Sequence, residues 1–474
     1  MIKIEPLAVC EVDAILNAAF DILENTGVAI HSEKAAELLK NNGCRSDGRH
    51  VWIERNLVKG CFENAPERID IFSRDGEPAM ELYGENVYYG PGVTCPYVFD
   101  PYTGERRTAT KQFVVDVATV ADALPNVDFL MSLCMIADVT PLFADLQEVH
   151  SLLSISPKPI LTWAFNTKNL HGIIEMFQAA AGGAEQFRER PCGIVYSEPT
   201  SPLVHSGEAL DKLMLLAKNM IPAVYSPGMT LGGTAPVTMA GALSLGLADS
   251  FVGLVVSQLT KPGAPVILGA NGGALDMRTL QSSYSSLEMC LMESAANQVY
   301  RRFGVPTFGL AGATDGKSMN MQEGADAAVQ CLFSTLSCSN LVHDFGMMDI
   351  GMTGSIDYMV YCDELAAMSK FLRKGIEVNP ETLAADLIRK AGPGGNFIAE
   401  EHTARNFRQA LFMPDYVPRT TYEMWEKRGK KTTEELVREK TLKILKEHKP
   451  KPLAQNKKEA LDRILGRFIS GGNV

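Results

Sequence analysis

Short apolar runs recur at a nearly constant interval along the middle of the chain. Each run has four to eight residues, and amphipathic or wholly apolar segments of helical length separate one run from the next. The runs begin near Val127, Pro159, Pro191, Ile221, Ala264, Val305 and Asn340. Strands that alternate with helices in this way predict parallel pairing through right-handed crossovers.

This alternation predicts an α/β fold of the TIM (β/α)8 barrel class. An open doubly wound sheet is the alternative, but no GxGxxG motif follows a first strand. The eighth strand is not evident, and either 349–353 or a segment near Phe397 could supply it. We expect three parts, which are an N-terminal α/β elaboration over 1–110, the barrel over 111–400 and a helical C-terminal extension over 401–474 packed on the barrel.

The flanking patterns are less regular. Residues 3–43 have helical spacing, with Ser32 at a capping position and a stop at Gly43. Residues 50–90 alternate in the manner of strands. The most apolar window, 239–259, contains one aspartate, three serines and a glutamine, which favours a core helix over a membrane span.

Composition narrows the class of protein. The net charge of −11 and the lack of a basic face argue against nucleic-acid binding. Ten cysteines without a CxxC pair indicate reduced, mostly buried thiols and not a disulfide framework. The first residues lack the basic and apolar regions of a signal peptide, so we expect a cytoplasmic protein with no membrane segment.

Residues capable of chemistry follow the predicted strands. In a barrel these strand ends converge on one mouth, where active sites lie. The glycine-rich loops among them predict a wide opening, although ordinary turn chemistry would also explain such loops. The strand-end residues are Trp163, Phe165, Asn166, Tyr196, Ser197, Glu198, Tyr225, Ser226, Asn271, Thr314, Asp315, His343 and Asp344.

Several reaction classes lack their motifs. The sequence has neither an HExxH motif nor paired cysteines, which are the usual zinc ligands. It has no GxSxG motif for a nucleophilic serine, and the glycines at 392–395 are not followed by the Lys-Ser/Thr of a phosphate-binding loop. No predicted strand ends in a lysine suited to a Schiff base. His343 and Asp344 are adjacent, but strict strand alternation turns them to opposite faces unless the strand has ended.

Aromatic side chains near the predicted mouth suggest a cationic ligand. Aromatic faces attract quaternary ammonium groups without hydrogen bonds. Each of these residues could equally belong to the core. The candidates are Tyr97, Phe99, Trp163, Phe165, Tyr225 and Phe345.

The chain resembles the trimethylamine methyltransferase superfamily over nearly its whole length. The resemblance rests on LENTGVAIHSEKAAELL, YYGPGVTCPYVFDPYTGERR, the 305–352 region and GPGGNFIAEEHTARNFRQALFMPDYVPRTTYEMWEKRG. It implies a TIM barrel that moves a methyl group from an amine to the Co(I) corrinoid of a separate small carrier protein. The archetype uses pyrrolysine, and this sequence has ordinary residues at 314–322, which is similar to the non-pyrrolysine branch acting on quaternary amines.

The resemblance implies glycine betaine as the leading substrate, with proline betaine, carnitine and γ-butyrobetaine as alternatives. His343, with Asp315 and Thr314, is then the catalytic candidate, placed near the cobalt face, while Arg278 or Lys317 could hold a carboxylate. The corrinoid-facing candidates are Asn166, Glu198, Asn271, Gly228 and Gly272. No protein-bound metal is expected, and barrels of this size often form homo-oligomers. A barrel lyase and a non-catalytic quaternary-amine sensor are the alternatives of other classes.

Overall fold

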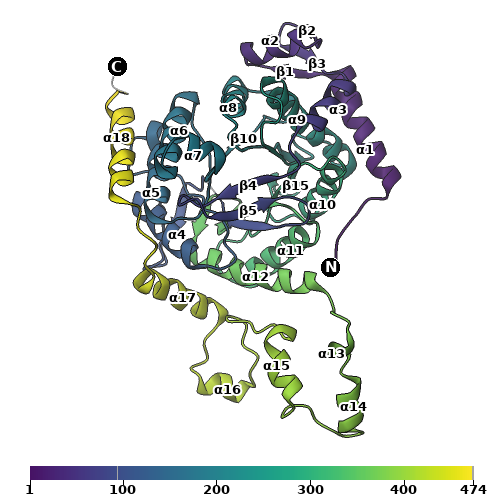
Figure 1. Cartoon of the computed structure of the whole chain (residues 1–474), viewed down its shortest axis with the longest axis vertical. Coiled ribbons are helices and arrows are strands. Elements are labelled where there is room, and N and C mark those ends of the chain that lie inside the picture. Colours follow the sequence, from purple (N-terminus) through teal and green to yellow (C-terminus); the bar gives the residue numbers. More distant parts are fainter. Residues whose placement is uncertain (93, 472–474) are drawn as a thin grey trace.

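Parallel strands surrounded by helices form the body of the molecule (Figure 1). The computed structural model describes residues 1–92 and 94–471. Two parallel ladders carry the predicted strands. One has the order β14-β12-β10-β9, with β14 Val266–Leu268, β12 Ala223–Tyr225, β10 Gly193–Ser197 and β9 Ile160–Thr162. The other has the order β17-β18-β6, with β17 Phe308–Leu310, β18 Leu341–Phe345 and β6 Tyr88–Pro91.

Single contacts connect the edges of these two ladders. Leu268 at the end of β14 forms a parallel bridge with Thr307 beside β17. At the other edges, the Asp128 N–H donates to the Tyr89 carbonyl oxygen at 2.6 Å, and Leu130 bridges to Ile160 of β9. The run that begins at Val127 therefore lies between β6 and β9 without forming a regular strand of its own.

β6 adds a parallel strand beside β18, a position that the sequence pattern did not predict. Neither segment named for that role joins a parallel ladder beside β17 or β9. Residues 349–352 form a turn before β20 (Thr353–Ser355), and the chain around Phe397 has no strand. β6 comes instead from the region assigned to the N-terminal elaboration, so residues 1–110 contribute directly to the central sheet.

Helices follow the strands where the periodicity predicts them. The long apolar helix α9 (Met239–Thr260) is a core helix, since 83% of its most apolar window is buried inside the protein. Its Asp249 accepts hydrogen bonds from the Ser201 hydroxyl and the Leu203 N–H. The other helices of this set are α4 Lys111–Ala123, α5 Ala144–Ile155, α6 Thr167–Ala181, α7 Ala184–Glu189, α8 Gly207–Lys218, α10 Leu287–Arg301 and α11 Met321–Leu336.

A separate apolar cluster lies within the parallel strands. It combines the β4 (Ile69–Phe72) and β5 (Pro78–Leu82) hairpin with residues from successive strands. Backbone N–H groups of Phe72 and Arg74 donate to the carbonyl oxygens of Pro191 and Pro157, just before β10 and β9. The hairpin therefore closes the amino ends of the strands. The strand members are Phe129, Met131, Leu161, Ile194, Val224, Ile267, Phe308 and Leu341.

The N-terminal region forms a small α/β layer beside α8 and α9. It was expected to be helical over 3–43, and a short strand, β1, interrupts the helices because Val28 and Ile30 pair with β3 and β11 (Val204–His205). Ser32 caps α2 as predicted, accepting from the Ala35 N–H. The elements are α1 Val9–Asp21, a π-helical turn Ile22–Thr26, β1 Val28–Ile30, α2 Glu33–Asn41, β2 Arg45–Asp47, β3 His50–Trp52 and α3 Arg55–Asn64.

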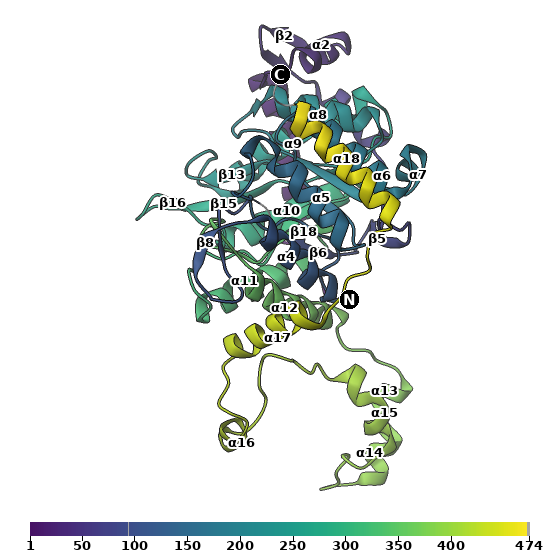
Figure 2. The ribbon, with the colours of Figure 1, turned by 90° about the vertical axis from the view of Figure 1, so that its left-hand side faces the viewer.

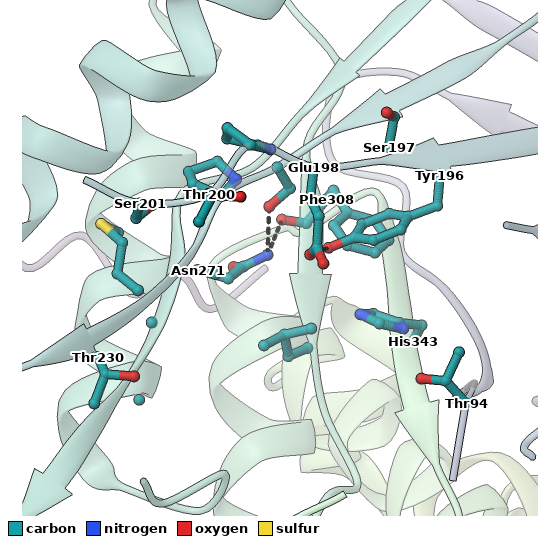
Figure 3. Close-up of a pocket in the computed structure, with 18 of the residues that line it drawn as sticks. Thr94, Tyr196, Ser197, Glu198, Thr200, Ser201, Thr230, Asn271, Phe308 and His343 are labelled. Atoms are coloured by element: carbon teal, nitrogen blue, oxygen red, sulfur yellow. Dashed lines mark hydrogen bonds between the residues drawn. The ribbon is translucent and has the colours of Figure 1, made fainter. Parts of the chain in front are cut away.

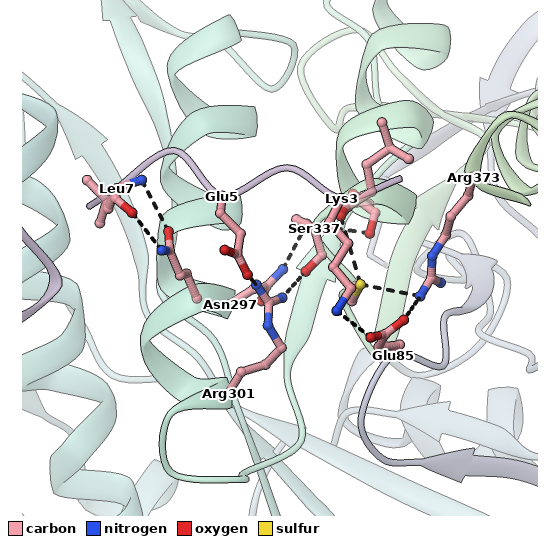
Figure 4. A network of polar contacts seen from close by, with 12 residues as sticks. Lys3, Glu5, Leu7, Glu85, Asn297, Arg301, Ser337 and Arg373 are labelled. Atoms are coloured by element: carbon pink, nitrogen blue, oxygen red, sulfur yellow. Dashed lines mark hydrogen bonds and ion pairs between the residues drawn. The ribbon is translucent and has the colours of Figure 1, made fainter. Parts of the chain in front are cut away.

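Polar contacts hold the first residues against the body (Figure 4). Leu7 exchanges backbone hydrogen bonds with the Gln298 side chain at 3.2 and 2.7 Å. Glu85 pairs with Lys3 and, at 3.1 Å, with Arg373. The N-terminal segment thus links α10 and α11 to α12 (Ile356–Lys374).

The C-terminal part divides into a packed portion and a projecting one. α17 (Thr433–Glu447) packs on α12 and α4, and α18 (Gln455–Gly471) packs on α6 and α5. Residues 376–431, which we call the arm, extend away from the body (Figures 1 and 2). The arm contains α13 Pro380–Leu383, α14 Ala385–Ala391, α15 Glu401–Ala410 and α16 Tyr422–Lys427.

Candidate active site

A deep pocket opens at the carboxyl ends of the parallel strands. Its volume is about 650 Å³, and its lining includes residues directly after β9, β10 and β12, residues within β17 and β18, and Asn271, which follows β14. In Figure 3 the side chains of Tyr196, Phe308 and His343 surround a shared space. The strand ends therefore converge as the periodicity predicted, because parallel strands place their carboxyl ends on one side.

His343 and Asp344 both line this pocket, although alternation would have separated them. Asp344 has a φ of +92°, a left-handed conformation that side chains seldom adopt, and the β18–β6 pairing shifts register between Val342 and Phe345. The strand irregularity turns Asp344 to the same side as His343. The expectation of opposite faces is wrong for this physical reason.

Burial determines the charge of this pair. The His343 side chain is neutral, because burial lowers its pKa to about 3. Burial raises the pKa of the Asp344 carboxyl to about 8, helped by the charge of Glu293. His343 Nδ1 lies 3.0 Å from Asp344 Oδ1 but without hydrogen-bond geometry, and neither carboxylate oxygen has a hydrogen-bond partner among the described residues.

A second carboxyl group and an aromatic cluster complete the wall. The Tyr196 hydroxyl donates to Glu198 Oε2 at 2.5 Å, and burial raises the pKa of Glu198. The Phe308 ring stacks on His343 at 4.5 Å and lies 5.5 Å from Tyr196. The pocket thus offers aromatic faces and the carboxyl groups of Asp344, Glu198 and Glu208 to one ligand.

Asn271 contributes an amide group to the pocket and Lys212 an ammonium group. Asn271 donates to the Ser226 hydroxyl at 3.1 Å, which leaves its buried Oδ1 without a partner in the described chain. Lys212 of α8 is the one lysine or arginine among the described lining residues. Its ammonium donates to the Ala164 carbonyl oxygen at 2.7 Å, and burial lowers its pKa.

Residues outside the pocket hold its walls in place. Glu148 accepts from the Trp163 indole N–H at 3.2 Å and from the Ile136 N–H, and burial raises its pKa to about 8. Asp315 accepts from the Ser283 hydroxyl at 2.5 Å and from the Tyr284 N–H at 2.8 Å. Asp315 therefore positions a loop of the pocket and does not face its space.

The predicted site residues separate into two groups. The pocket lining includes His343, Trp163, Glu198, Asn271, Gly228 and Gly272. The others, outside this lining, are Thr314, Asp315, Tyr97, Phe99, Phe165, Tyr225, Arg278, Phe345 and Asn166.

Local partners explain the positions outside the lining. Arg106 stacks over the Tyr97 ring at 3.8 Å, and the buried Tyr225 hydroxyl bonds to His205 at 2.8 Å. Phe345 stacks on Tyr89 at 5.0 Å in the core. Arg278 is 89% exposed and pairs with Asp276. Phe99 lies in β7 (Tyr97–Phe99), a strand paired with β20 outside the parallel ladders.

The remaining residues outside the lining have structural roles or lie at the surface. Thr314 donates to Asp326 at 2.6 Å. Asn166 caps α6 by accepting from the Asn169 N–H. Phe165 is half exposed, with its ring 6.2 Å from Trp163. Lys317, the other carboxylate candidate, is 65% exposed and outside the lining.

Sequence reasoning missed Lys212 and Tyr284. Lys212 lies inside a helix, so no strand-end rule selects it. Tyr284 follows β16 (Gln281–Ser282), which pairs with β15 (Asn271–Asp276) in a hairpin over the mouth. The Gly272 and Gly273 loop was the available signal, since β15 passes close to Ser283 and leaves no room for a Cβ at Gly273.

The chain is similar to methyltransferases that act on methylated amines, both in sequence and in fold. The chain is 29% identical over 451 residues to a trimethylamine methyltransferase of Desulfitobacterium hafniense strain DCB-2, covering 94% of this chain and 90% of that protein. It is 28% identical to a glycine betaine methyltransferase of D. hafniense strain Y51, covering 88% and 87%. The crystal structure of the Methanosarcina barkeri monomethylamine methyltransferase has a similar fold, with a TM-score of 0.54 at 11% identity over 99% of this chain and 89% of that one.

These similarities identify the chain as an enzyme of methyl transfer. Residues 1–469 match the family model described as trimethylamine methyltransferase (MTTB), and the chain belongs to this family. The match confirms the family resemblance seen in the sequence.

Proposed function

We propose that this enzyme removes a methyl group from a carboxylated quaternary amine, with glycine betaine as the first candidate, and transfers it to the Co(I) corrinoid of a separate carrier protein. The observation that carries the proposal is the composition of the pocket. The buried carboxyl group of Asp344, the carboxyl groups of Glu198 and Glu208 nearer the opening, and several aromatic rings line one space with a single lysine among the described lining residues. Relatives of both substrate types match with nearly equal identity, so the pocket must decide between them.

A (β/α)8 barrel is the architecture that best unites the two parallel ladders. Its support is the sequence of contacts from β9 through β14, across the Leu268–Thr307 bridge to β18 and β6, and from Tyr89 through Leu130 back to β9. One apolar cluster takes residues from the strands around this circuit. The pocket then occupies the position typical of active sites in such barrels.

The carboxyl groups select a cation. A quaternary ammonium group cannot donate a hydrogen bond, so charge and aromatic faces must hold it. Asp344 and Glu198 supply the charge, while Tyr196, Phe308 and Trp163 supply the faces. No lysine or arginine of the described residues pairs with the carboxylate oxygens of Asp344, which favours a positively charged ligand.

Lys212 distinguishes carboxylated substrates from simple amines. Its ammonium lies at the pocket wall, whereas Arg278 and Lys317 lie outside the lining. A carboxylate bound to Lys212 would orient the ammonium group toward the acidic side. Proline betaine, carnitine and γ-butyrobetaine share both charges and differ in the distance between them, so they are the alternatives within this class.

The reaction places few demands on acid–base groups. The C–N bond breaks with its electron pair kept by nitrogen, and the product leaves as a neutral tertiary amine without a proton transfer. The corrinoid supplies Co(I), the nucleophile that accepts the methyl group. The protein orients one N-methyl group, excludes water and holds the carboxylate.

The residues present suit an approaching corrinoid. A Cβ added to Gly228 meets nothing within 4 Å. Asn271 Oδ1, His343 Nδ1 and both carboxylate oxygens of Asp344 lack hydrogen-bond partners among the described residues. Neutral His343 would contact the corrinoid edge or a bound water without repelling a cationic substrate. The reduced, mostly buried thiols suit a cytoplasmic setting for this chemistry.

Mixing the enzyme with reduced free cobalamin and a panel of amines tests the proposal. Formation of methylcobalamin, followed by its absorbance, should occur with glycine betaine or another carboxylated quaternary amine. Turnover with trimethylamine alone would overturn the substrate class. Binding of betaines by calorimetry without turnover would indicate a sensor, and the absence of both would reject the proposal.

A further inference from the structure

The arm (376–431) contacts the body mainly around one point, where Tyr416 is buried and the Phe412 ring lies 5.6 Å from Phe371 of α12. It leaves α12 at Gly375 and returns at α17 (Figures 1 and 2). At Asp415 and Tyr416, backbone N–H groups donate to Glu364 Oε2 at 2.7 and 2.9 Å and fasten it to α12. None of its four helices contains a buried residue.

Apolar side chains cover the arm. Ile376 is 92% exposed and Ile398 is 84% exposed, although isoleucine is among the residues most often buried. Exposed apolar surface of this extent usually marks an interaction site. The other exposed apolar residues are Val378, Leu383, Ile388, Phe397, Leu411, Met413, Val417, Tyr422 and Met424.

The secondary structure of the arm also requires a partner. The longest arm helix, α15, has ten residues, and helices of that length are marginal in water without tertiary packing. The turns at Gly392 and Gly429 are held by hydrogen bonds to the preceding helix, from their own N–H groups to the carbonyl oxygens of Ile388 and Glu426. Short helices with exposed apolar side chains therefore favour a surface that covers the arm.

Charge indicates the nature of that surface. The arm has nine lysine and arginine residues and eight acidic ones, whereas the remainder of the chain has 36 basic and 48 acidic residues. Beside α16 lies a groove of about 430 Å³ lined by Trp425, Met413 and the cations Arg419, Arg428 and Lys431. This groove suits an apolar segment flanked by carboxylates.

We infer that the arm packs on the acidic body of a second copy of this chain. A carrier protein must approach and leave the pocket mouth during turnover and would leave the arm uncovered between encounters. A second copy is always present, and mutual exchange of two arms closes a symmetric pair. The groove has three cations and one carboxylate, Asp415, in its lining, and the acidic body supplies the complementary negative charge.

The molar mass of the full-length protein tests the inference. Light scattering at micromolar concentration should give at least twice the chain mass of 51.6 kDa. The double variant Ile398→Asp and Leu411→Asp should shift to 51.6 kDa, because it places two charges on the contact surface. Val9→Asp is the matched control, since Val9 is 73% exposed on α1, and it should keep the wild-type mass.

Hydrogen exchange provides a second readout without mutation. The amides of α15 should be protected at micromolar concentration and lose protection on dilution, together with the fall in mass. A monomeric wild-type protein, or a double variant that keeps the wild-type mass, would overturn the inference. Protection of α15 that appears only when a corrinoid carrier is added would also overturn it and assign the arm to the carrier. These results are independent of which amine is demethylated.

Discussion

The parallel strands bury apolar side chains at their amino ends and polar ones at their carboxyl ends. At the amino ends, the β4–β5 hairpin packs Ile71 and Met80 against side chains from successive strands. At the carboxyl ends, the same strands lead to Asp344, His343 and Asn271, which are buried with unpartnered polar atoms among the described residues. Burying an unpaired polar group costs free energy, whereas burying apolar surface yields it.

The difference indicates that stability and ligand recognition depend on opposite ends of the same parallel strands. A change at the apolar end should lower the free energy of unfolding and leave binding intact. A change at the polar end should do the reverse. The following variants test this separation.

His343→Ala should have the largest effect on catalysis. Loss of the imidazole removes a group that orients the reacting partners, and demethylation should fall at least about 100-fold. The initial rate of methylcobalamin formation measures it. Cooperative thermal unfolding should persist, and unchanged turnover would contradict the role of His343.

Ile71→Ala should have the largest effect on stability. Ile71 is fully buried in the cluster closed by the hairpin, and its truncation should lower the free energy of unfolding by about 2–5 kcal/mol. Urea denaturation measures the change, with Val9→Ala at an exposed position as the control. A loss of betaine affinity in folded Ile71→Ala protein would show that the two ends are not independent.

Lys212→Met should weaken binding of carboxylated amines selectively. Removing one charged hydrogen bond of about 1.5–3 kcal/mol should raise the dissociation constant for glycine betaine about 10- to 100-fold. Titration calorimetry without corrinoid measures it. Tetramethylammonium, which has no carboxylate, serves as the control and should bind equally to both proteins; equal loss for both ligands would remove the carboxylate role.

The affinity for the substrate cation should increase with pH. Below its pKa of about 8, Asp344 is protonated in the free protein, and a cation prefers the ionised form. The dissociation constant should therefore fall by up to about tenfold per pH unit between pH 6 and 8. Asp344→Asn should abolish this dependence, and a wild-type affinity that is flat over this range would contradict the assignment.

Much of the central fold was predictable because strand and helix periodicities are local properties. The predicted runs at Pro159, Pro191, Ile221 and Ala264 became β9, β10, β12 and β14. The strand β6 could not be placed in this series, since its pairing with β18 joins residues far apart in sequence. Residue type alone also failed to separate pocket aromatics from core aromatics, as Trp163 and Tyr225 show.

The sequence by itself determined the family, the α/β alternation and the convergence of strand ends, because these depend on spacing and on long matching segments. Only the tertiary structure decided which side chains share the pocket. The positive φ of Asp344 brought it beside His343, and helix packing brought Lys212 to the wall. The tertiary structure also showed that the apolar side chains of the arm are exposed, because exposure depends on what a side chain contacts and not on its hydrophobicity.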